Sequence, residues 1–316
     1  MAARTDSVRV HYSPLYCDTE VAFDTTRKAQ AIAASLTQQP IRRARLVMPE
    51  SATREHLTSV HAPDYIDAVL TGSPRDLAVS NDLPGWDEGL ARAVCASTGG
   101  VIAAALHALE HRTVAGSLSS GLHHARYASG WGYCTVNGLA IAARAALDAG
   151  ARRVLVLDLD AHCGGGTADL IHGHDGRDGH RRHRGLDGVE QVDVSVDPFD
   201  YYGPHERTRL LLTDGPRYLH TVQTALDGID DPASIDLVLY NAGMDPHEKC
   251  EGGVAGISAL TLDRRERTVF SWFAQHRLPV AWVLAGGYTN QLSMGDLVNL
   301  HRLTIGAAAR SVGALS

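Results

Sequence analysis

Cysteines are few in this sequence, and their spacing matches no familiar metal-binding or disulfide pattern. Five occur among 316 residues, and no two of them have CxxC spacing. An odd number of widely scattered cysteines argues against a disulfide framework and against a cysteine zinc knuckle. Free thiols are typical of a reducing compartment, so we expect a cytoplasmic protein. The five are Cys17, Cys95, Cys134, Cys163 and Cys250.

The sequence also lacks the features of secreted, membrane-spanning and nucleic-acid-binding proteins. Residues 1–7 contain no apolar core of a signal peptide, and no apolar run approaches the roughly 20 residues that a membrane-spanning helix needs. The net charge of −7 argues against nucleic acid and against an anionic membrane surface as partners. What is present, 44% hydrophobic and 21% charged residues, is the composition of a soluble globular protein. An oligomer is compatible with all of this.

Short apolar segments alternate with helical patterns, which is typical of βαβ units around a parallel sheet. The predicted strands are apolar runs like those of strands buried on both faces. They cover residues 8–10, 153–157, 235–240 and 278–284. Segments 87–109 and 138–147 carry apolar or small residues at helical spacing and are predicted helices. No linker divides the chain, so we predict a single α/β domain over residues 1–316.

Polar or glycine-rich residues directly follow three of the predicted strands. The segments read DLDAHCGGG from Asp158, NAGMDPHE from Asn241 and AGGYTN from Ala285. In open α/β sheets the ligand site lies beyond the carboxyl ends of the strands. The three segments are therefore predicted to converge on one site.

The first two of these segments contain a candidate metal site. Asp158, Asp160 and His162 alternate along the chain, so their side chains point the same way in an extended segment. Asp160 and His162 can supply two ligands, and Asp245 can supply a third from a different strand end. Three protein ligands with open coordination positions are typical of a catalytic rather than a structural zinc site.

Other residues in the sequence could complete a hydrolytic site. Hydrolysis by a metal-activated water needs a base for the proton of the water and an acid for the leaving group. The adjacent His123 and His124 can fill both roles, and the glycine- and aromatic-rich segment 130–137 that follows suits the lining of a narrow slot. Tyr288, which follows two glycines, can donate a hydrogen bond to a developing oxyanion.

Taken together, these motifs closely resemble the histone deacetylase superfamily, which includes bacterial acetylpolyamine amidohydrolases and acetoin-utilisation proteins. The resemblance runs from about residue 11 to about residue 308, and its details are closest to the class IV deacetylases and their bacterial relatives. In family order the motifs are VHAPDY, GLHHA, GYCTVN, DLDAHCGGGT, NAGMD and AGGYT. The resemblance implies an arginase/deacetylase fold, in which helices flank a central, mostly parallel eight-stranded sheet.

The resemblance also implies one zinc ion per chain and a role for each catalytic residue. Asp160, His162 and Asp245 correspond to the zinc ligands. His123 and His124 correspond to the tandem histidines that handle protons, and Tyr288 to the residue that stabilises the tetrahedral intermediate. Asp158 corresponds to a residue that supports the first histidine and lies at a monovalent cation site, which suggests a structural potassium ion.

Four further residues correspond to substrate-binding positions of the family. Asp82 matches a loop aspartate that grips substrate amides. Tyr133 matches one wall of the acyl-lysine tunnel, and Tyr202 is the candidate for the opposite wall. Glu251 aligns with a position at the tunnel rim, where a carboxylate would attract a second cationic amine on a polyamine substrate.

The chain departs from the family pattern in three places. Cys163 stands where a second histidine is usual, and Gly165 stands where an aspartate or asparagine usually orients one of the tandem histidines. The loss at position 165 puts the second histidine–carboxylate pair in doubt unless a water or another residue replaces it. An arginine- and histidine-rich insertion, at about residues 176–188, has no counterpart in the pattern; its segment 177–184 reads RDGHRRHR.

Three functions are therefore compared. The first is a zinc-dependent amidohydrolase that removes an acyl group, in the first place acetyl, from acyl-lysine, acetylpolyamine or a small-molecule amide. The second is a binuclear manganese hydrolase of arginase type, which would need additional Asp and His ligands. The third is a weakly active or inactive binding module, for which Gly165 is the only argument.

Overall fold

The computed structural model describes residues 7–21, 24–176 and 181–312. One eight-stranded sheet runs through this part of the chain, and every neighbouring pair of its strands is parallel. In sheet order the strands are β2 (Ala44–Val47), β1 (Val8–His11), β3 (Val114–Ser117), β10 (Val280–Val283), β9 (Leu237–Asn241), β4 (Val154–Asp158), β7 (Val189–Ser195) and β8 (Thr208–Leu212). The predicted parallel α/β fold is confirmed.

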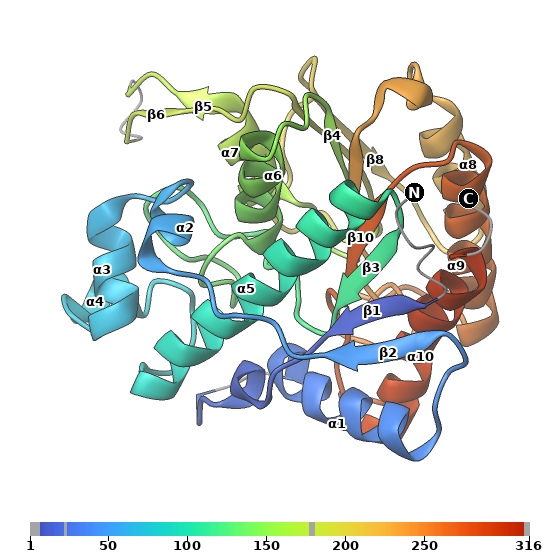
Figure 1. Cartoon of the computed structure of the whole chain (residues 1–316), viewed down its shortest axis with the longest axis horizontal. Coiled ribbons are helices and arrows are strands. Elements are labelled where there is room, and N and C mark those ends of the chain that lie inside the picture. The colour runs from blue at the N-terminus through green and yellow to red at the C-terminus, as the bar shows by residue number, and fades with distance from the viewer. Residues whose placement is uncertain (1–6, 22–23, 177–180, 313–316) are drawn as a thin grey trace.

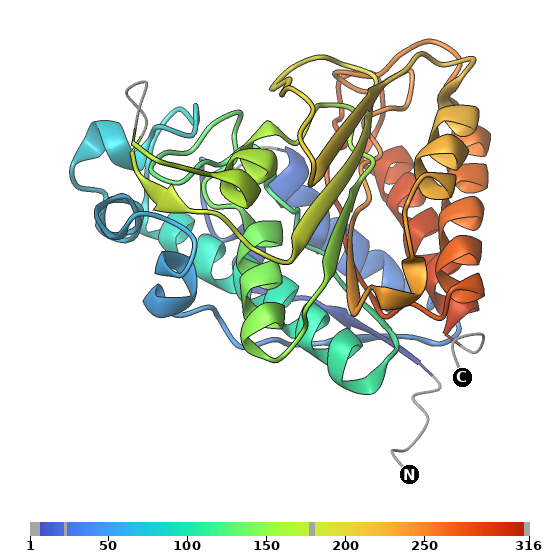
Figure 2. The ribbon, with the colours of Figure 1, turned by 90° about the horizontal axis from the view of Figure 1, so that it is seen from above.

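Helices cover both faces of the sheet, so the molecule has three layers (Figures 1 and 2). One face is packed by α1 (Asp24–Gln38), α8 (Tyr218–Asp227), α9 (Ala259–Gln275) and α10 (Met294–Ser311). The other is packed by α5 (Glu88–His111), α6 (Gly138–Asp148) and α7 (Gly165–His172), with α2 (Arg54–Thr58) and α3 (Pro63–Thr71) outside them. The short elements are α4 (Arg75–Ala78), η1 (Pro14–Cys17) and η2 (Pro232–Ser234). A separate apolar core lies on each face of the sheet.

The central strands form where the sequence has continuous apolar runs. Every residue of β4, β9 and β10 is buried, because both faces of these strands are covered by helices. Each of the three strands begins one or two residues after the predicted start. Strand β10 begins just after Pro279, whose ring removes a backbone donor and is tolerated only at the start of a strand.

Helix α5 crosses one face of the sheet and is the longest apolar element. Asp87 caps its start by accepting a hydrogen bond from the backbone N–H of Leu90 at 2.6 Å. By length and composition alone α5 could cross a membrane, so the expectation that no segment meets that test is wrong. However, 67% of its apolar window is buried inside the protein, as in the core helix of a soluble protein.

A small hairpin, whose second strand lies in the predicted insertion, projects from the body of the molecule (Figure 1). Its strands are β5 (Gly173–His174) and β6 (His183–Arg184), which pair in antiparallel register with His174 opposite His183. Residues 177–180, in the middle of the insertion, lie outside the described part of the chain.

Candidate active site

The three predicted metal ligands meet at the carboxyl edge of the sheet. Asp160 and His162 follow β4, and Asp245 follows the neighbouring strand β9. Each offers a ligand atom, and all these atoms lie within 4.8 Å of one another. The Nδ1 of His162 lies 3.1 Å from Oδ1 of Asp160 and 3.3 Å from Oδ2 of Asp245. We call these three residues the pocket cluster.

Backbone groups from adjacent strand ends hold the two carboxylates in place. The N–H of Gly286 donates to Asp160 Oδ2 at 2.7 Å, and the N–H of Ala161 donates to Asp245 Oδ1 at 3.1 Å. A Cβ at position 286 would lie 1.9 Å from Oδ2 of Asp245. Only glycine fits there, which explains the first glycine of the segment AGGYTN.

The charges of the pocket cluster fit a bound cation. Burial lowers the pKa of His162, but hydrogen bonds to the Asp160 and Asp245 carboxylates outweigh it and raise this pKa to about 11. Burial and the charge of Asp160 raise the pKa of Asp245 to about 7. Apart from its 3.3 Å contact with Nδ1 of His162, Oδ2 of Asp245 is buried without a hydrogen-bond partner among the described residues. Two buried carboxylates with an open lone pair and one imidazole form a set of donors that suits a divalent metal ion.

The first tandem histidine is held by Asp158, as the sequence predicts. The Nδ1 of His123 lies 2.8 Å from Oδ2 of Asp158, and because a carboxylate only accepts, Nδ1 is the donor. The amide of Asn241 donates to Oδ1 of the same carboxylate at 2.8 Å. Both His123 and Asp158 are buried.

The second tandem histidine has a carboxylate partner that the sequence analysis did not identify. Its Nδ1 donates to Oδ2 of Asp200 at 2.9 Å. Asp200 belongs to the loop after β7 and takes the place of the side chain that Gly165 lacks. A Cβ at position 165 would lie 2.3 Å from the backbone oxygen of Asp200 and 2.5 Å from Oδ1. Gly165 is therefore matched to Asp200, and the doubt about the second histidine–carboxylate pair is removed.

The environments of the two histidines push their pKa values apart. Burial lowers the pKa of His123, but the charges of Asp158 and Asp160 outweigh it and raise this pKa to about 10. Burial and the charge of His123 lower the pKa of His124 to about 4, against the opposing effect of Asp200. The Nε2 atoms of the two rings lie 3.1 Å apart, so a protonated His123 can donate to a neutral His124. A pair of titratable groups with divergent pKa values is a mark of acid–base chemistry.

A pocket with a volume of about 410 Å³ leads to these residues. Its walls include the half-exposed rings of Tyr133 and Phe199. Tyr202 is not among the described residues that line the pocket. Its hydroxyl instead donates a hydrogen bond to the carbonyl of Arg209 at 3.3 Å. The predicted wall residue opposite Tyr133 is therefore corrected from Tyr202 to Phe199, which lies three residues earlier in the same loop.

Two other predicted substrate residues lie at or near the mouth of the pocket. Glu251 lines the pocket and accepts a hydrogen bond from the amide of Asn290 at 2.9 Å. Asp82 is exposed beside the pocket, and its carboxylate accepts a hydrogen bond from the N–H of Gly132 at 2.9 Å. Both carboxylates therefore already have one partner within the protein.

Tyr288 lies between this pocket and a smaller inner cavity of about 30 Å³. The inner cavity is also lined by both tandem histidines, by Cys134 and by Asp160. Burial and the nearby carboxylates of Asp245 and Asp160 raise the pKa of Tyr288 well above its usual value. The phenol therefore keeps its proton and can donate a hydrogen bond at neutral pH.

Comparison with known sequences identifies the family. The sequence model of the histone deacetylase domain matches residues 22–177. An uncharacterised protein of Picosynechococcus is 33% identical over 276 residues, which are 84% of each chain. The chain belongs to the histone deacetylase superfamily. Histone deacetylase 2 of Arabidopsis thaliana is 26% identical over 77% of this chain and 63% of its own length, and human histone deacetylase 1 is 30% identical over 42% and 29%.

Solved structures show the same deacetylase fold. The HDA15 HD domain superposes with a TM-score of 0.75 at 19% identity and covers 96% of this chain and 90% of that one. An acetylpolyamine aminohydrolase from Burkholderia pseudomallei superposes with a TM-score of 0.74 at 20% identity, covering 95% and 98%. The predicted arginase/deacetylase architecture is therefore confirmed.

Proposed function

We propose that this protein is a zinc-dependent amidohydrolase that removes a short acyl group from an amine, with acetyl as the preferred acyl group. Membership of the histone deacetylase superfamily supports a hydrolase of deacetylase type. The observation that carries the proposal is the pair formed by His124 and Asp200. It supplies the orienting carboxylate whose absence at position 165 was the one argument for an inactive binding module.

Asp160, His162 and Asp245 would hold a single zinc ion. The chemistry that zinc supplies when bound is polarisation of the acyl carbonyl and a lower pKa for water. Three protein ligands with open positions suit this use. The alternative of a binuclear manganese centre needs more ligands, and the group that the described residues form at the pocket contains only these three.

The side chains around the pocket cluster would move the protons. His124 is oriented by Asp200 with Nε2 unprotonated. It can accept the proton of the attacking water when its hydrogen bond with His123 is exchanged for one with the water. His123, charged and held by Asp158, can donate a proton to the leaving amine. Tyr288 can donate a hydrogen bond to the oxyanion that forms when water adds to the carbonyl.

The inner cavity supports a short acyl chain. Its volume of about 30 Å³ has room for roughly two water-sized groups, which is enough for the methyl of an acetyl group. At the other end of the pocket, Tyr133 and Phe199 would pack against the methylene chain of the amine, and Glu251 would face a second positive charge on a polyamine.

The remaining parts of the proposal concern the second ion, the partners and the location. Burial and the charge of Asp158 raise the pKa of Asp193 well above its usual value. A monovalent cation such as potassium beside Asp158 would offset the repulsion between these two carboxylates. An acylated amine is the proposed partner. The free thiols of all five cysteines support a cytoplasmic location.

A substrate panel with two variants tests the proposed function. The full chain is assayed on acetyl-lysine peptide, long-acyl-lysine peptide, acetylpolyamine and acetylated small molecules, with zinc and with a chelator. We expect zinc-dependent release of acetate from at least one acetyl substrate, and losses of roughly 100-fold or more in His123→Ala and Tyr288→Phe. Turnover that survives chelation, or no turnover on any substrate, contradicts the proposal.

A further inference from the structure

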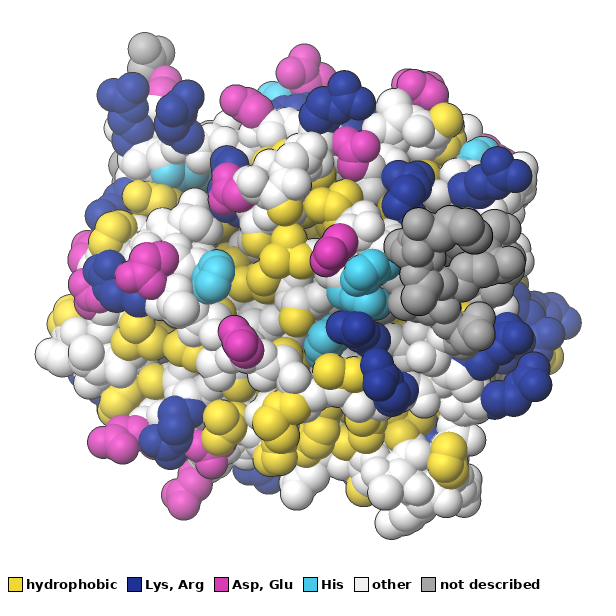
Figure 3. All heavy atoms as spheres, in the orientation of Figure 1, with side chains coloured by type: hydrophobic (Ala, Val, Ile, Leu, Met, Phe, Trp, Pro, Cys, Tyr) yellow, Lys and Arg dark blue, Asp and Glu magenta, His cyan; other side chains and the backbone are white. Residues whose placement is uncertain are grey.

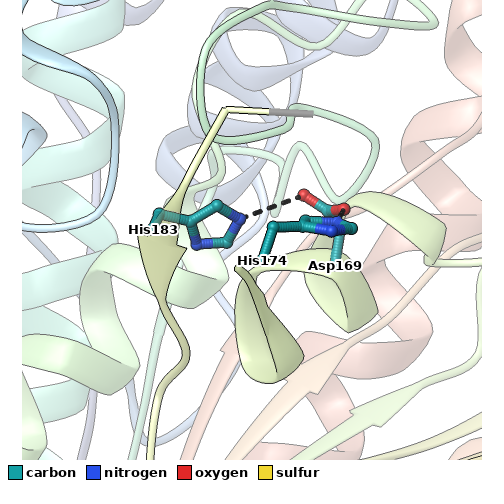
Figure 4. A group of neighbouring side chains, drawn as sticks. All are labelled: Asp169, His174 and His183. Carbon is teal, nitrogen blue, oxygen red and sulfur yellow. Dashed lines mark hydrogen bonds and ion pairs between the residues drawn. The ribbon is translucent and has the colours of Figure 1, made fainter. Parts of the chain in front are cut away.

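A second group of aspartate and histidine side chains, which shares no residue with the pocket cluster, lies where the projecting hairpin meets α7 (Figure 4). Asp169 lies on α7, and His174 and His183 lie on β5 and β6. The two histidines are directly opposite each other in the antiparallel pair, so their side chains share one face of the hairpin. We call these three residues the hairpin cluster. Each offers a ligand atom, and these atoms all lie within 4.8 Å of one another.

Asp169 is the centre of the hairpin cluster. The Nε2 of His174 lies 2.5 Å from its Oδ1, and the Nε2 of His183 lies 3.7 Å from its Oδ2. The side chain of His183 is only 4% exposed and that of Asp169 only 11%. The ring of His183 stacks on Tyr127 at 4.5 Å between centroids, which fixes the direction in which Nε2 points.

The hydrogen bond that His183 makes to the backbone leaves the other ring nitrogen, Nε2, able to bind a cation. Its Nδ1 lies 3.3 Å from the carbonyl oxygen of Arg184, which can only accept, so Nδ1 carries a proton. In the neutral ring Nε2 then has a free lone pair, and this lone pair faces the carboxylate of Asp169. At 3.7 Å the two atoms are too far apart for a hydrogen bond, and among the described residues this buried Nε2 has no hydrogen-bond partner.

We propose that the hairpin cluster is a second site for a zinc-class divalent metal ion, distinct from the pocket cluster. Zinc binds imidazole nitrogen and carboxylate oxygen at about 2.0–2.2 Å, so two of its ligand atoms lie roughly 3.4 Å apart. The 3.7 Å between Nε2 of His183 and Oδ2 of Asp169 is close to this value. The 2.5 Å between Nε2 of His174 and Oδ1 of Asp169 is a hydrogen bond, so a metal ion would have to replace the proton and widen this pair. A backbone carbonyl that binds the other nitrogen of a histidine ring is a common support for a metal ligand.

A metal ion at this site would fasten the hairpin to the body of the protein. Its ligands would join α7 to both strands of a hairpin that has only two residues in each strand. Such a short isolated pair is marginal by itself. Outside the cluster, Arg181 forms an ion pair of 2.7 Å with the exposed Asp64 at the start of α3. Basic side chains gather on the surface over the hairpin (Figure 3), so the metal would stabilise a positively charged projection.

One nearby charge opposes the metal. The Nη1 of Arg126 lies 3.8 Å from Oδ1 of Asp169, while its Nη2 donates to Oδ1 of Asp200. Arg126 therefore neutralises part of the charge of Asp169. We expect weaker zinc binding at the hairpin cluster than at the pocket cluster, which has two buried carboxylates.

Zinc content and thermal stability of the full chain test this site. The protein is dialysed against zinc alone, and zinc per chain is measured by elemental analysis. We expect two zinc ions in the wild type, one in His183→Gln, one in Asp245→Asn and none in the double variant. Glutamine at position 183 keeps a side chain that can hydrogen-bond to Asp169, so the hairpin is expected to fold. His220→Gln, an exposed histidine on α8, is the matched control and should keep both ions.

The thermal measurement uses Asp245→Asn, in which only the hairpin cluster can bind. Zinc should raise its Tm, because binding to the folded state alone stabilises it, and adding His174→Gln should weaken this response by roughly 10-fold or more in zinc concentration. If zinc neither binds to Asp245→Asn nor raises its Tm, the hairpin cluster is an ion pair between protonated histidine and Asp169, and the site is overturned. The site is also overturned if Asp245→Asn binds one zinc ion fewer than the wild type but His183→Gln binds as many as the wild type. If His183→Gln binds one zinc ion fewer and Asp245→Asn binds as many as the wild type, the result counts against the proposed zinc site in the pocket cluster.

Discussion

The pocket cluster and the hairpin cluster contain the same kinds of side chain in different surroundings. The pocket cluster sits on loops that leave the central strands of a sheet buried on both faces, whereas the hairpin cluster joins one helix to a projecting pair of short strands. Around the first, the structure gathers two histidine–carboxylate pairs, the phenol of Tyr288 and a pocket. Around the second, it gathers a stacked tyrosine and Arg126.

The difference shows that metal ligands alone do not make a hydrolytic site. A metal can activate water only where a base, an acid and an oxyanion donor lie beside it and a substrate can enter. The pocket cluster has candidates for each of these. The hairpin cluster has two of its three ligands well buried and is suited to a structural ion. The following variants test this division of roles.

The largest effect is expected from removing a ligand of the pocket cluster. Asp245→Asn should lower kcat/KM by at least roughly 1000-fold, because it removes a charged ligand from a buried centre. The variant should still bind one zinc ion at the hairpin cluster. Steady-state kinetics with elemental analysis provide the measurement, and His220→Gln serves as the control. More than a tenth of the wild-type activity would contradict the assignment of Asp245.

The next effect concerns the carboxylate that replaces the missing family residue. Asp200→Asn should lower kcat by roughly 100-fold with little change in KM, because the amide no longer favours the tautomer in which Nε2 of His124 is a base. Asp187→Asn, whose side chain is 95% exposed, is the matched control. Equal kinetics in the two variants would show that His124 does not depend on Asp200.

Restoring the usual family residue should be harmful in this chain. In Gly165→Asp the new Cβ would meet the backbone and the side chain of Asp200 at less than 3 Å. We expect a roughly tenfold loss of activity and a free energy of unfolding lower by about 1–3 kcal/mol, as for other overpacked sites. Chemical denaturation and kinetics check this. Unchanged or higher activity would mean that Asp200 can move away from the new side chain without loss of function.

The smallest effect is expected at the rim of the pocket. Glu251→Leu should weaken turnover of acetylpolyamine by roughly two- to fivefold, the range of an exposed ion pair, and leave acetyl-lysine turnover unchanged. Glu110→Leu, an exposed glutamate at the end of α5, is the control. Equal losses on both substrates would remove the argument for a polyamine preference.

The sequence predicts the central strands well because their burial leaves a continuous apolar run. Strand β7 is not predicted, although it lies inside the sheet between β4 and β8 and six of its seven residues are buried. Its sequence VEQVDVS contains the buried polar residues Gln191, Asp193 and Ser195. Two of them find partners on a distant loop: Nε2 of Gln191 donates to the carbonyl of Gly164 at 3.2 Å, and Asp193 accepts a hydrogen bond from the N–H of Gly164 at 2.6 Å. A strand with buried polar side chains shows neither a continuous apolar run nor a regular alternation of apolar and polar residues, so its sequence does not indicate a strand.

The same reason limits prediction of the site. Residues in compact motifs, such as Asp160 and His162, were found because the family motifs are local in sequence. Asp200 supplies its carboxylate from 35 residues beyond Gly165, in a loop with no motif of its own, and it adopts a positive φ of 59°. Only the three-dimensional structure shows that one position compensates for the other. The correction of Tyr202 to Phe199 has the same origin, since loop conformation decides which ring faces the pocket.

Arg126 gives the two clusters a common element. One end of its guanidinium binds the carboxylate that orients His124, and the other end lies near Asp169 of the hairpin cluster. A cation on Asp169 would repel this guanidinium and change how it shares its charge with Asp200. If the ion at the hairpin cluster changes the affinity of the pocket for an acyl substrate, thermodynamic linkage requires that the substrate changes the affinity of the hairpin cluster for the ion by the same factor. The projecting hairpin would then report on, and respond to, occupancy of the pocket.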